Sequence, residues 1–339
     1  MRITVLTVLS LGLGIIPLPA QVFPAKPVPT PGGPVISGQP VLPNKPSLST
    51  ESPSTNGDPN ANGLKEVPYA KLSEPTSNRL GQAALSIRPT EWKHAETANF
   101  IYHYFNRFVA NPVSVEAEFY YRVIAKDLGK DTSSWERKCH IYIFEGKADW
   151  AAFQKVGGLD PWTGGLHSQN ELFINRDPSF KWQGDTLGHE TAHLVVDRFY
   201  GTTNIPLWLN EGYAEYIGSV GYAAFYRARG FTAKPRSIPV APKDFMPLAT
   251  LVGLTSYPPE PQVSTYYNES EKLVRYLTSL DGNKFNVFLE QMGKGRRLEN
   301  ALSSAYGSSL TMAKLQADFT LYATKDYNSQ NIRAQGNAN

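Results

Sequence analysis

Two histidines four residues apart, with a glutamate directly after the first, are the strongest chemical signal in the sequence. They are His189, Glu190 and His193 in the stretch LGHETAHLVVD. From Asp185 to Tyr200 the apolar and polar residues follow a helical period, so both histidines lie on one helical face. Side chains at i and i+4 are about 5–6 Å apart, and two imidazoles at that spacing can bind one metal ion. Glu190 points off this face but stays close enough to hold a water molecule as a general base.

A catalytic zinc site of this kind needs a third protein ligand. Asp197 extends the row to i+8, but eight helical residues rise about 12 Å, so we interpret it as a supporting or surface acid. A second helix, predicted in NIPLWLNEGYAEYIG, carries Glu211 and Glu215 one turn apart. An acid on this helix would complete a His-His-Glu set and leave the fourth zinc position open for water. Taken singly, either glutamate could instead lie on a solvated helix face.

The two stretches HETAH and WLNEGYAEY together resemble the gluzincin metallopeptidases, the clan that includes thermolysin and the aminopeptidase N-type enzymes. The resemblance is greatest to the peptidase-MA-like domains of secreted bacterial proteins. It implies a zinc-dependent peptidase with one Zn²⁺ per chain, bound by His189, His193 and Glu211. It also implies that Glu215 supports a histidine ligand, for which His189 is the candidate. Peptide hydrolysis would use Glu190 as the general base.

The resemblance assigns a role to the segment before the zinc-binding helix. In the clan the preceding strand is the sheet edge, and an extended peptide adds to it by main-chain hydrogen bonds. That strand is ELFINR here, so the expected substrate-binding residues are Glu171, Leu172, Phe173 and Ile174. The preceding GGLHSQN lacks the glycine-methionine-glutamate-asparagine motif of aminopeptidase N-type enzymes, which favours an endopeptidase or a narrow-specificity enzyme. His167 in this turn is either a loop histidine or a substrate contact.

A tyrosine in the stretch STYYNESEKLVRYL is a candidate catalytic residue. In the aminopeptidase N-type enzymes, a tyrosine ten residues before the corresponding leucine donates a hydrogen bond to the oxyanion of the tetrahedral intermediate. That register selects Tyr267. A neutral phenol suits this role because it is protonated near neutral pH. The register leaves Tyr266 open as the alternative, and both tyrosines could instead be packing aromatics.

The segments around these residues predict an α+β fold. Strands are predicted in NFIYHY, CHIYIF and ELFINR, and helices from Ser114 to Gly129, in KADWAAFQKV, and throughout the chain beyond the zinc-binding helix. Such an order of strands and helices segregates the helices to one side. Together with the resemblance, it predicts a zincin-like metallopeptidase domain. Its small mixed sheet would place an edge strand beside the zinc-binding helix, and a mostly helical C-terminal part would follow.

Composition divides the chain into four predicted regions. Residues 1–25 hold an apolar run and small-residue cleavage sites, as in a signal peptide, with an uncleaved anchor as the alternative. Residues 26–84 are rich in Pro, Gly and Ser and are predicted to be a disordered tether. Residues 85–324 would form the metallopeptidase domain and residues 325–339 a flexible tail. We therefore expect a secreted or periplasmic bacterial protein with no stable membrane span after signal cleavage.

Charge and cysteine content narrow the remaining alternatives. The formal net charge of +3 gives no indication of nucleic-acid binding, so the expected partner is a peptide or protein substrate. Cys139 is the only cysteine, which rules out an internal disulfide, and we predict a buried strand thiol. A catalytically silent zinc-containing binding or cell-surface module stays open, although a silent site has no need of Glu190. A scaffold with structural zinc would require a fourth side-chain ligand, which Cys139 on an early strand does not suit.

Overall fold

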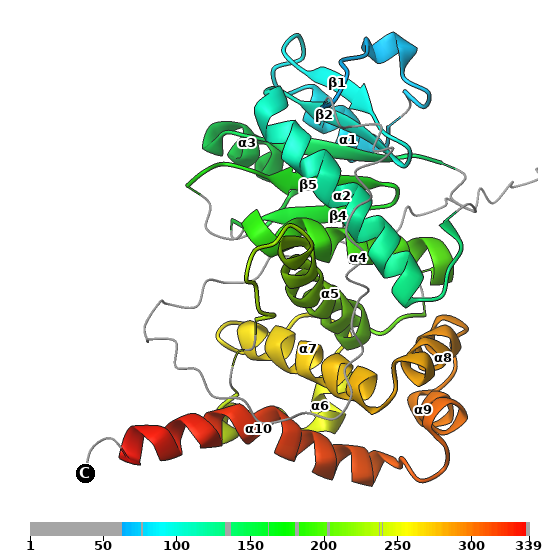
Figure 1. Ribbon diagram of the computed structural model, residues 1–339, viewed down its shortest axis with the longest axis vertical. Coiled ribbons are helices and arrows are strands. Elements are labelled where there is room, and N and C mark those ends of the chain that lie inside the picture. The colour runs from blue at the N-terminus through cyan, green and yellow to red at the C-terminus, as the bar shows by residue number, and fades with distance from the viewer. Residues whose placement is uncertain are drawn as a thin grey trace, which may run out of the picture.

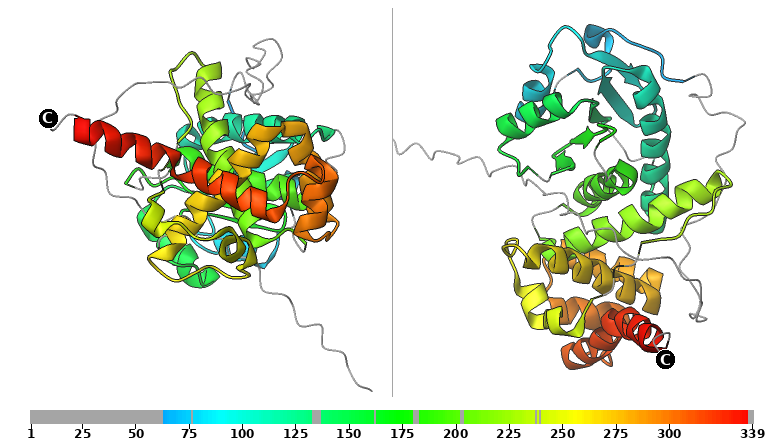
Figure 2. Two further views of the ribbon diagram at one scale, coloured as in Figure 1. Left: turned by 90° about the horizontal axis from the view of Figure 1, so that it is seen from below. Right: turned by 90° about the vertical axis from the view of Figure 1, so that its left-hand side faces the viewer.

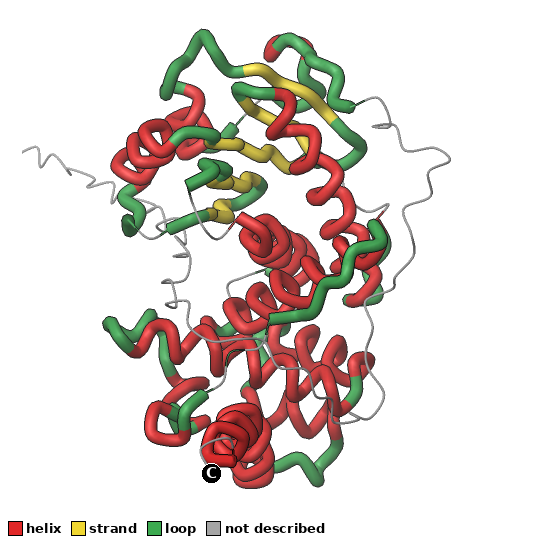
Figure 3. The backbone as a smooth tube through the Cα atoms, turned by 60° about the vertical axis from the view of Figure 1, so that its left-hand side comes forward, coloured by secondary structure: helices red, strands yellow, loops and turns green. Residues whose placement is uncertain are grey.

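The computed structural model describes residues 63–75, 77–132, 137–161, 163–179, 183–201, 204–236, 238 and 240–336. The predicted signal peptide at residues 1–25, and the predicted tether as far as residue 62, lie outside the described residues. Figure 1 shows an upper part built on the sheet, a lower part built of helices, and helices α4 and α5 where the two parts meet. Figure 3 shows the same division, with the strands confined to one half of the molecule.

A mixed sheet, as predicted, forms the upper part, and it has five strands. Its strands lie in the order β1-β2-β3-β5-β4; β2, β3 and β5 are parallel, while β1 and β4 pair antiparallel at the two edges. The strands are β1 (Lys93–Glu96), β2 (Phe100–Tyr104), β3 (Cys139–Phe144), β4 (Gly165–Ser168) and β5 (Glu171–Asn175). Sequence patterns identify β2, β3 and β5 but miss both edge strands, since four residues are too few for an alternating pattern. Cys139 is buried in β3, as predicted.

Helices cover both faces of the sheet. Alternate side chains of a strand point to opposite faces, and accordingly Tyr142 and Phe173 pack into one apolar cluster, while Ile141 and Leu172 pack into the other. Helices α1 (Arg79–Leu85) and α3 (Lys147–Gly157) belong to the first face, and α2 (Arg107–Asp127) and α4 (Gln183–Tyr200) to the second. The prediction that the helices segregate to one side is therefore wrong, because helices also precede and separate the strands along the chain. Helix α2 begins before the predicted Ser114, because Asn106 caps its first turn by accepting a hydrogen bond from Phe108 N.

Residues 63–75 and 77–84 belong to the folded domain, which corrects the predicted tether boundary at residue 84. Leu64, Leu72 and Leu80 are buried, and Glu66 forms an isolated antiparallel bridge with Ala95 of β1. The side chain of Asn78 caps α1. Polar and Pro-rich composition hides this segment in the sequence, because widely spaced leucines produce no periodic signal. Near the C-terminus, α10 (Met312–Gly336) extends beyond residue 324 into the predicted tail of residues 325–339.

The chain after α4 is helical, as predicted. It forms α5 (Leu207–Ala228), α6 (Leu248–Gly253), α7 (Gln262–Leu280), α8 (Gly282–Gly293), α9 (Leu298–Tyr306) and then α10. Helix α5 packs between α4 and α7, and the right-hand view of Figure 2 shows this layering. A Cβ atom on Gly212 would lie 2.4 Å from the Ser270 carbonyl oxygen, so only glycine permits the backbones of α5 and α7 to approach this closely. Within the described residues, no helix has the length and apolarity needed to cross a membrane.

Candidate metal centre

Helices α4 and α5 bring together the three side chains that the sequence predicts as metal ligands. His189 Nε2 lies 3.0 Å from His193 Nε2, and Glu211 Oε2 lies 3.6 and 3.8 Å from these two nitrogens. Ligands bound tetrahedrally at 2.0–2.1 Å lie about 3.3 Å from one another, so the three atoms already have the spacing of a zinc site. Among the described residues, only these three form such a group of possible ligands. That leaves a fourth position with no side-chain ligand.

Burial and charge both favour a cation at this place. His193 and Glu211 have no exposed surface, and Glu211 Oε2 has no hydrogen-bond partner within the described part of the chain. A buried carboxylate oxygen without a partner is costly unless a cation or water satisfies it. Burial raises the pKa of Glu211 to about 7, although the charge of His189 and the Tyr257 hydroxyl oppose the shift. The residues present therefore fit a zinc ion.

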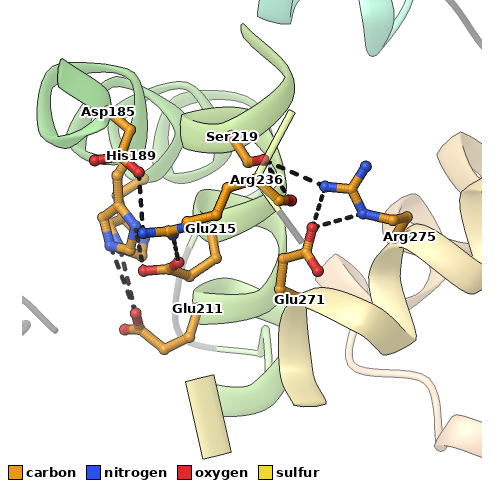
Figure 4. A network of polar contacts seen from close by, with 9 residues as sticks. Asp185, His189, Glu211, Glu215, Ser219, Arg236, Glu271 and Arg275 are labelled. Atoms are coloured by element: carbon orange, nitrogen blue, oxygen red, sulfur yellow. Dashed lines mark hydrogen bonds and ion pairs between the residues drawn. The ribbon is translucent and has the colours of Figure 1, made fainter. Parts of the chain in front are cut away.

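Each histidine has an acceptor for its second ring nitrogen. His189 Nδ1 faces Glu215 Oε1 at 3.5 Å, and His193 Nδ1 lies 3.1 Å from Asn210 Oδ1 (Figure 4 shows the first of these contacts). Such contacts fix the ring and its tautomer, so that Nε2 presents its lone pair to the metal position. The structure thus places Glu215 beside His189. Asn210 was missed, although its sequence signal is a polar residue immediately before the third ligand in an otherwise apolar helix.

Glu190, which directly follows the first candidate ligand on α4, lies against the edge strand β4. It is buried, and the backbone N–H of His167 on β4 donates a hydrogen bond to its carboxylate. Burial raises the pKa of Glu190 to about 8, against the opposing charge of His189. Its Oε2 has no hydrogen-bond partner among the described residues. A carboxylate held on one side and open on the other suits proton transfer to and from a water molecule.

Strand β4, rather than β5, is the edge of the sheet beside α4. The prediction that β5 is the edge strand, with Glu171, Leu172, Phe173 and Ile174 binding the substrate, is therefore wrong. The backbone of β5 is already paired with β3 on one side and β4 on the other. The Glu171 carboxylate instead accepts a 2.6 Å hydrogen bond from Asn78 N ahead of α1.

The histidine of the predicted turn is a residue of this edge strand. His167 is buried on β4, and its Nε2 lies 2.5 Å from the Gln169 carbonyl oxygen and 4.0 Å from Asp197 Oδ2. Its ring stacks near that of His193, with 6.4 Å between the ring centroids. Asp197 thus lies beside a neighbour of the site and contributes no ligand, which agrees with its interpretation as a supporting acid.

Two tyrosines from the helical part reach the third ligand. The Tyr257 hydroxyl donates a 2.7 Å hydrogen bond to Glu211 Oε1, and the Tyr267 hydroxyl also bonds to this carboxylate. Their rings stack with 5.8 Å between centroids. Tyr266 is equally buried, and its hydroxyl pairs with Ser270 of the same helix. Tyr257 was missed because it lies in the Pro-rich loop before α7, where no periodic pattern marks its position.

An arginine from the loop after α5 completes the polar network of Figure 4. Arg236 Nη1 lies 3.2 Å from Asp185 Oδ2 on α4, and Nη2 donates to Glu215 Oε2 on α5. A second arginine pair, Arg275 with Glu271, lies on α7 nearby and reaches α5 through Ser219. No sequence pattern singled out either arginine.

The fold and the site define a class of protein with a buried His-His-Glu centre between a mixed sheet and a helical layer. The family model of the Peptidase MA superfamily matches residues 123–322, which is more than half of the chain and includes all three candidate ligands. The chain therefore belongs to the Peptidase MA superfamily. A search of curated proteins gives no match.

Proposed function

We propose that this protein is a zinc-dependent peptidase of the gluzincin type. The spacing of the His189, His193 and Glu211 ligand atoms, with Glu190 beside them, is the observation that supports this proposal most strongly. A bound zinc ion would polarise the scissile carbonyl group and lower the pKa of a water molecule. Membership of the superfamily supports a metallopeptidase at the coarser level.

The chain's own residues would divide the chemistry between them. Glu190 takes a proton from the attacking water and passes it to the leaving amine, while the His167 N–H holds its carboxylate in place. Glu215 and Asn210 orient the two histidines. Tyr267 is the proposed donor to the oxyanion, because its hydroxyl already lies at the Glu211 carboxylate. Tyr266 remains the alternative.

The proposed substrate is a peptide segment that adds to the edge strand β4. Gly164 O accepts a hydrogen bond from Asn175 N, so the backbone groups of Gly165 and His167 face away from β5. The His167 N–H is engaged by Glu190, so an extended peptide could pair with the Gly165 N–H and C=O groups and the His167 C=O group and run past Glu190 toward the metal. We propose endopeptidase action rather than aminopeptidase action, since the chain lacks the aminopeptidase N-type motif for a free amine. We also propose that residues 1–25 direct the protein to a secreted or periplasmic location.

A digest of a peptide library by the purified protein, with and without a zinc chelator, tests this proposal. We expect cleavage that the chelator abolishes and that restored zinc recovers. A Glu190→Gln protein serves as the control, because it keeps all three ligands and loses the base. A wild-type protein that binds one zinc ion per chain and cleaves no peptide would overturn the proposal in favour of a silent zinc-containing module.

A further inference from the structure

We propose that Arg236 is a positioning residue that couples the metal centre to the segment after α5. This inference rests on the proposed function, because it concerns how tightly the centre holds zinc. After α5 ends at Ala228, the chain returns along that helix, and the Arg236 guanidinium group inserts between α4 and α5 (Figure 4). It pairs with Asp185 on the first helix and Glu215 on the second. Two helices and one loop therefore meet at a single side chain.

Glu215 is shared between Arg236 and the metal ligand. Its Oε2 accepts from Arg236, while its Oε1 faces His189 Nδ1 at 3.5 Å. The contacts form a chain from Asp185 through Arg236 and Glu215 to His189. Because Glu215 is 6 % exposed, a charged partner is needed to hold its carboxylate in one orientation. By fixing the Glu215 carboxylate, Arg236 also fixes the orientation of the His189 ring.

The arginine is held in turn by its own segment. Ser219 Oγ on α5 donates a 3.1 Å hydrogen bond to the Arg236 carbonyl oxygen, and Arg227 Nη1 donates a 3.3 Å bond to the Ala233 carbonyl oxygen. A cleft adjoins the guanidinium group and is lined by Glu215, Ser219, Arg236, Ile238, Asn268 and Glu271. The position of the loop and the orientation of His189 therefore depend on each other. Such coupling acts in both directions, so zinc binding should also hold the loop in place.

Contact with both acids at once requires the planar guanidinium group of arginine. Its two terminal nitrogens contact acids on different helices, at 3.2 Å for Asp185 and at closer range for Glu215. A lysine ammonium is a point charge and cannot reproduce that two-sided geometry. Loss of a group that orients a metal-binding histidine weakens metal affinity about 10- to 100-fold. We expect a loss in this range for Arg236→Gln and a smaller loss for Arg236→Lys.

Arg275 provides a matched control. Its ion pair with Glu271 borders the same cleft, its side chain is 23 % exposed against 26 % for Arg236, and it also touches Ser219. Among the described residues, its hydrogen bonds and ion pairs reach Glu271 and Ser219, and neither of these is bonded to a candidate ligand. If the effect of Arg236→Gln came only from the general loss of an ion pair, Arg275→Gln should weaken zinc affinity to the same extent.

The test measures the zinc dissociation constant by competition with a chromophoric chelator for the wild type, Arg236→Gln, Arg236→Lys and Arg275→Gln. We expect Arg275→Gln to bind as the wild type does and Arg236→Gln to bind about 10- to 100-fold more weakly. Adding Arg236→Gln to a Glu215→Gln protein should cause little further loss, because both residues act along one path. Equal affinities of the Arg236→Gln and Arg275→Gln proteins, or full additivity with Glu215→Gln, would overturn the inference.

Limited proteolysis provides the second readout and keeps the inference testable if Arg236→Gln folds poorly. Zinc should protect the segment after α5, residues 229–247, in the wild type and in Arg275→Gln, and should protect it less in Arg236→Lys. Equal protection in all of these proteins would contradict the coupling. Failure of the wild type to bind zinc would overturn the proposed function instead, so the two failures are distinguishable.

Discussion

Replacement of Gly165 by alanine should displace the general base without touching a metal ligand. A Cβ atom at this position of β4 would lie 2.7 Å from Glu190 Oε1, 2.9 Å from Glu190 Cγ and 2.6 Å from Thr186 Cγ2. These are closer than the 3.4 Å at which ordinary contact begins. The first two neighbours belong to the side chain proposed as the base. Its carboxylate must move because the backbone of β4 is fixed by pairing with β5.

The size of the displacement sets the size of the expected effect. To restore an ordinary contact of 3.4 Å from 2.7 Å, the Glu190 carboxylate must shift by about 0.7 Å. A misplacement of about 1 Å costs about 10²-fold in rate, so we expect kcat to fall about 10- to 100-fold. The inserted methyl group should also cost about 1–3 kcal/mol of stability through overpacking. Zinc content should stay at one per chain, since His189, His193 and Glu211 keep their positions.

The assay combines kcat on a cleaved peptide with metal analysis and thermal unfolding. Gly253→Ala serves as the control, because a Cβ atom on Gly253 would meet nothing within 4 Å. A Gly165→Ala enzyme with a kcat within twofold of the wild-type value would refute the reasoning. It would mean either that Glu190 moves freely or that it is not the base.

Three further predictions follow from the site and from the sheet. His193→Ala should lose zinc, whereas Glu190→Gln should keep one zinc ion per chain and its fold but lose peptide hydrolysis; metal analysis and a peptide assay distinguish the two. Tyr267→Phe should lower kcat by about 10²- to 10³-fold with KM nearly unchanged, and the same loss in Tyr266→Phe instead would show that the register is wrong. Burial raises the pKa of Glu171 from 4.5 to about 7, so its stabilising contribution is complete below pH 4.5 and is lost as the pH rises through 7. Between pH 5 and pH 8, the free energy of unfolding in urea should therefore fall by about 2 kcal/mol more for the wild type than for Glu171→Gln. An equal change in the free energy of unfolding of the two proteins would contradict this prediction.

The candidate ligand set was predictable because it depends on local periodicity. His189 and His193 lie one helical turn apart, and the position of one fixes the position of the other on the same helix face. Glu211 required one further step, namely that a neighbouring helix packs against the first. In the structure α5 does pack against α4, on the side opposite to α7. Asn210 follows from Glu211, because it precedes this ligand on the same helix.

The edge strand beside α4 was mispredicted because strand order is not a local property. In the sequence β5 directly precedes α4, but the sequence does not reveal that β4 pairs with the side of β5 that faces away from β3. A four-residue strand with one glycine and one histidine has no alternating apolar pattern, so it is predicted as a turn. The role of Glu171 changed for the same reason. Once β5 is internal, its first residue meets the chain before α1 instead of solvent or substrate.

Residues on loops were the least predictable part of the site. Tyr257 and Arg236 lie outside helices and strands, so neither hydrophobic period nor capping pattern restricts their positions. Each becomes identifiable only through a contact with a glutamate on α5: Tyr257 with Glu211 and Arg236 with Glu215. Sequence spacing identifies these two acids, and only the folded chain identifies what holds them.

The location of the site between two structural layers explains why its parts are so dispersed in the sequence. Strand β4 holds Glu190 from the sheet side, whereas Tyr257 and Tyr267 approach Glu211 from the helical side. Under the proposed function, a peptide that pairs with β4 and reacts at the metal would contact groups from both layers. The distance between the layers is set by the packing of α5 against α4 and α7, including the close backbone approach at Gly212. A substitution that widens this packing should therefore separate the base from the oxyanion donor even when every ligand remains in place.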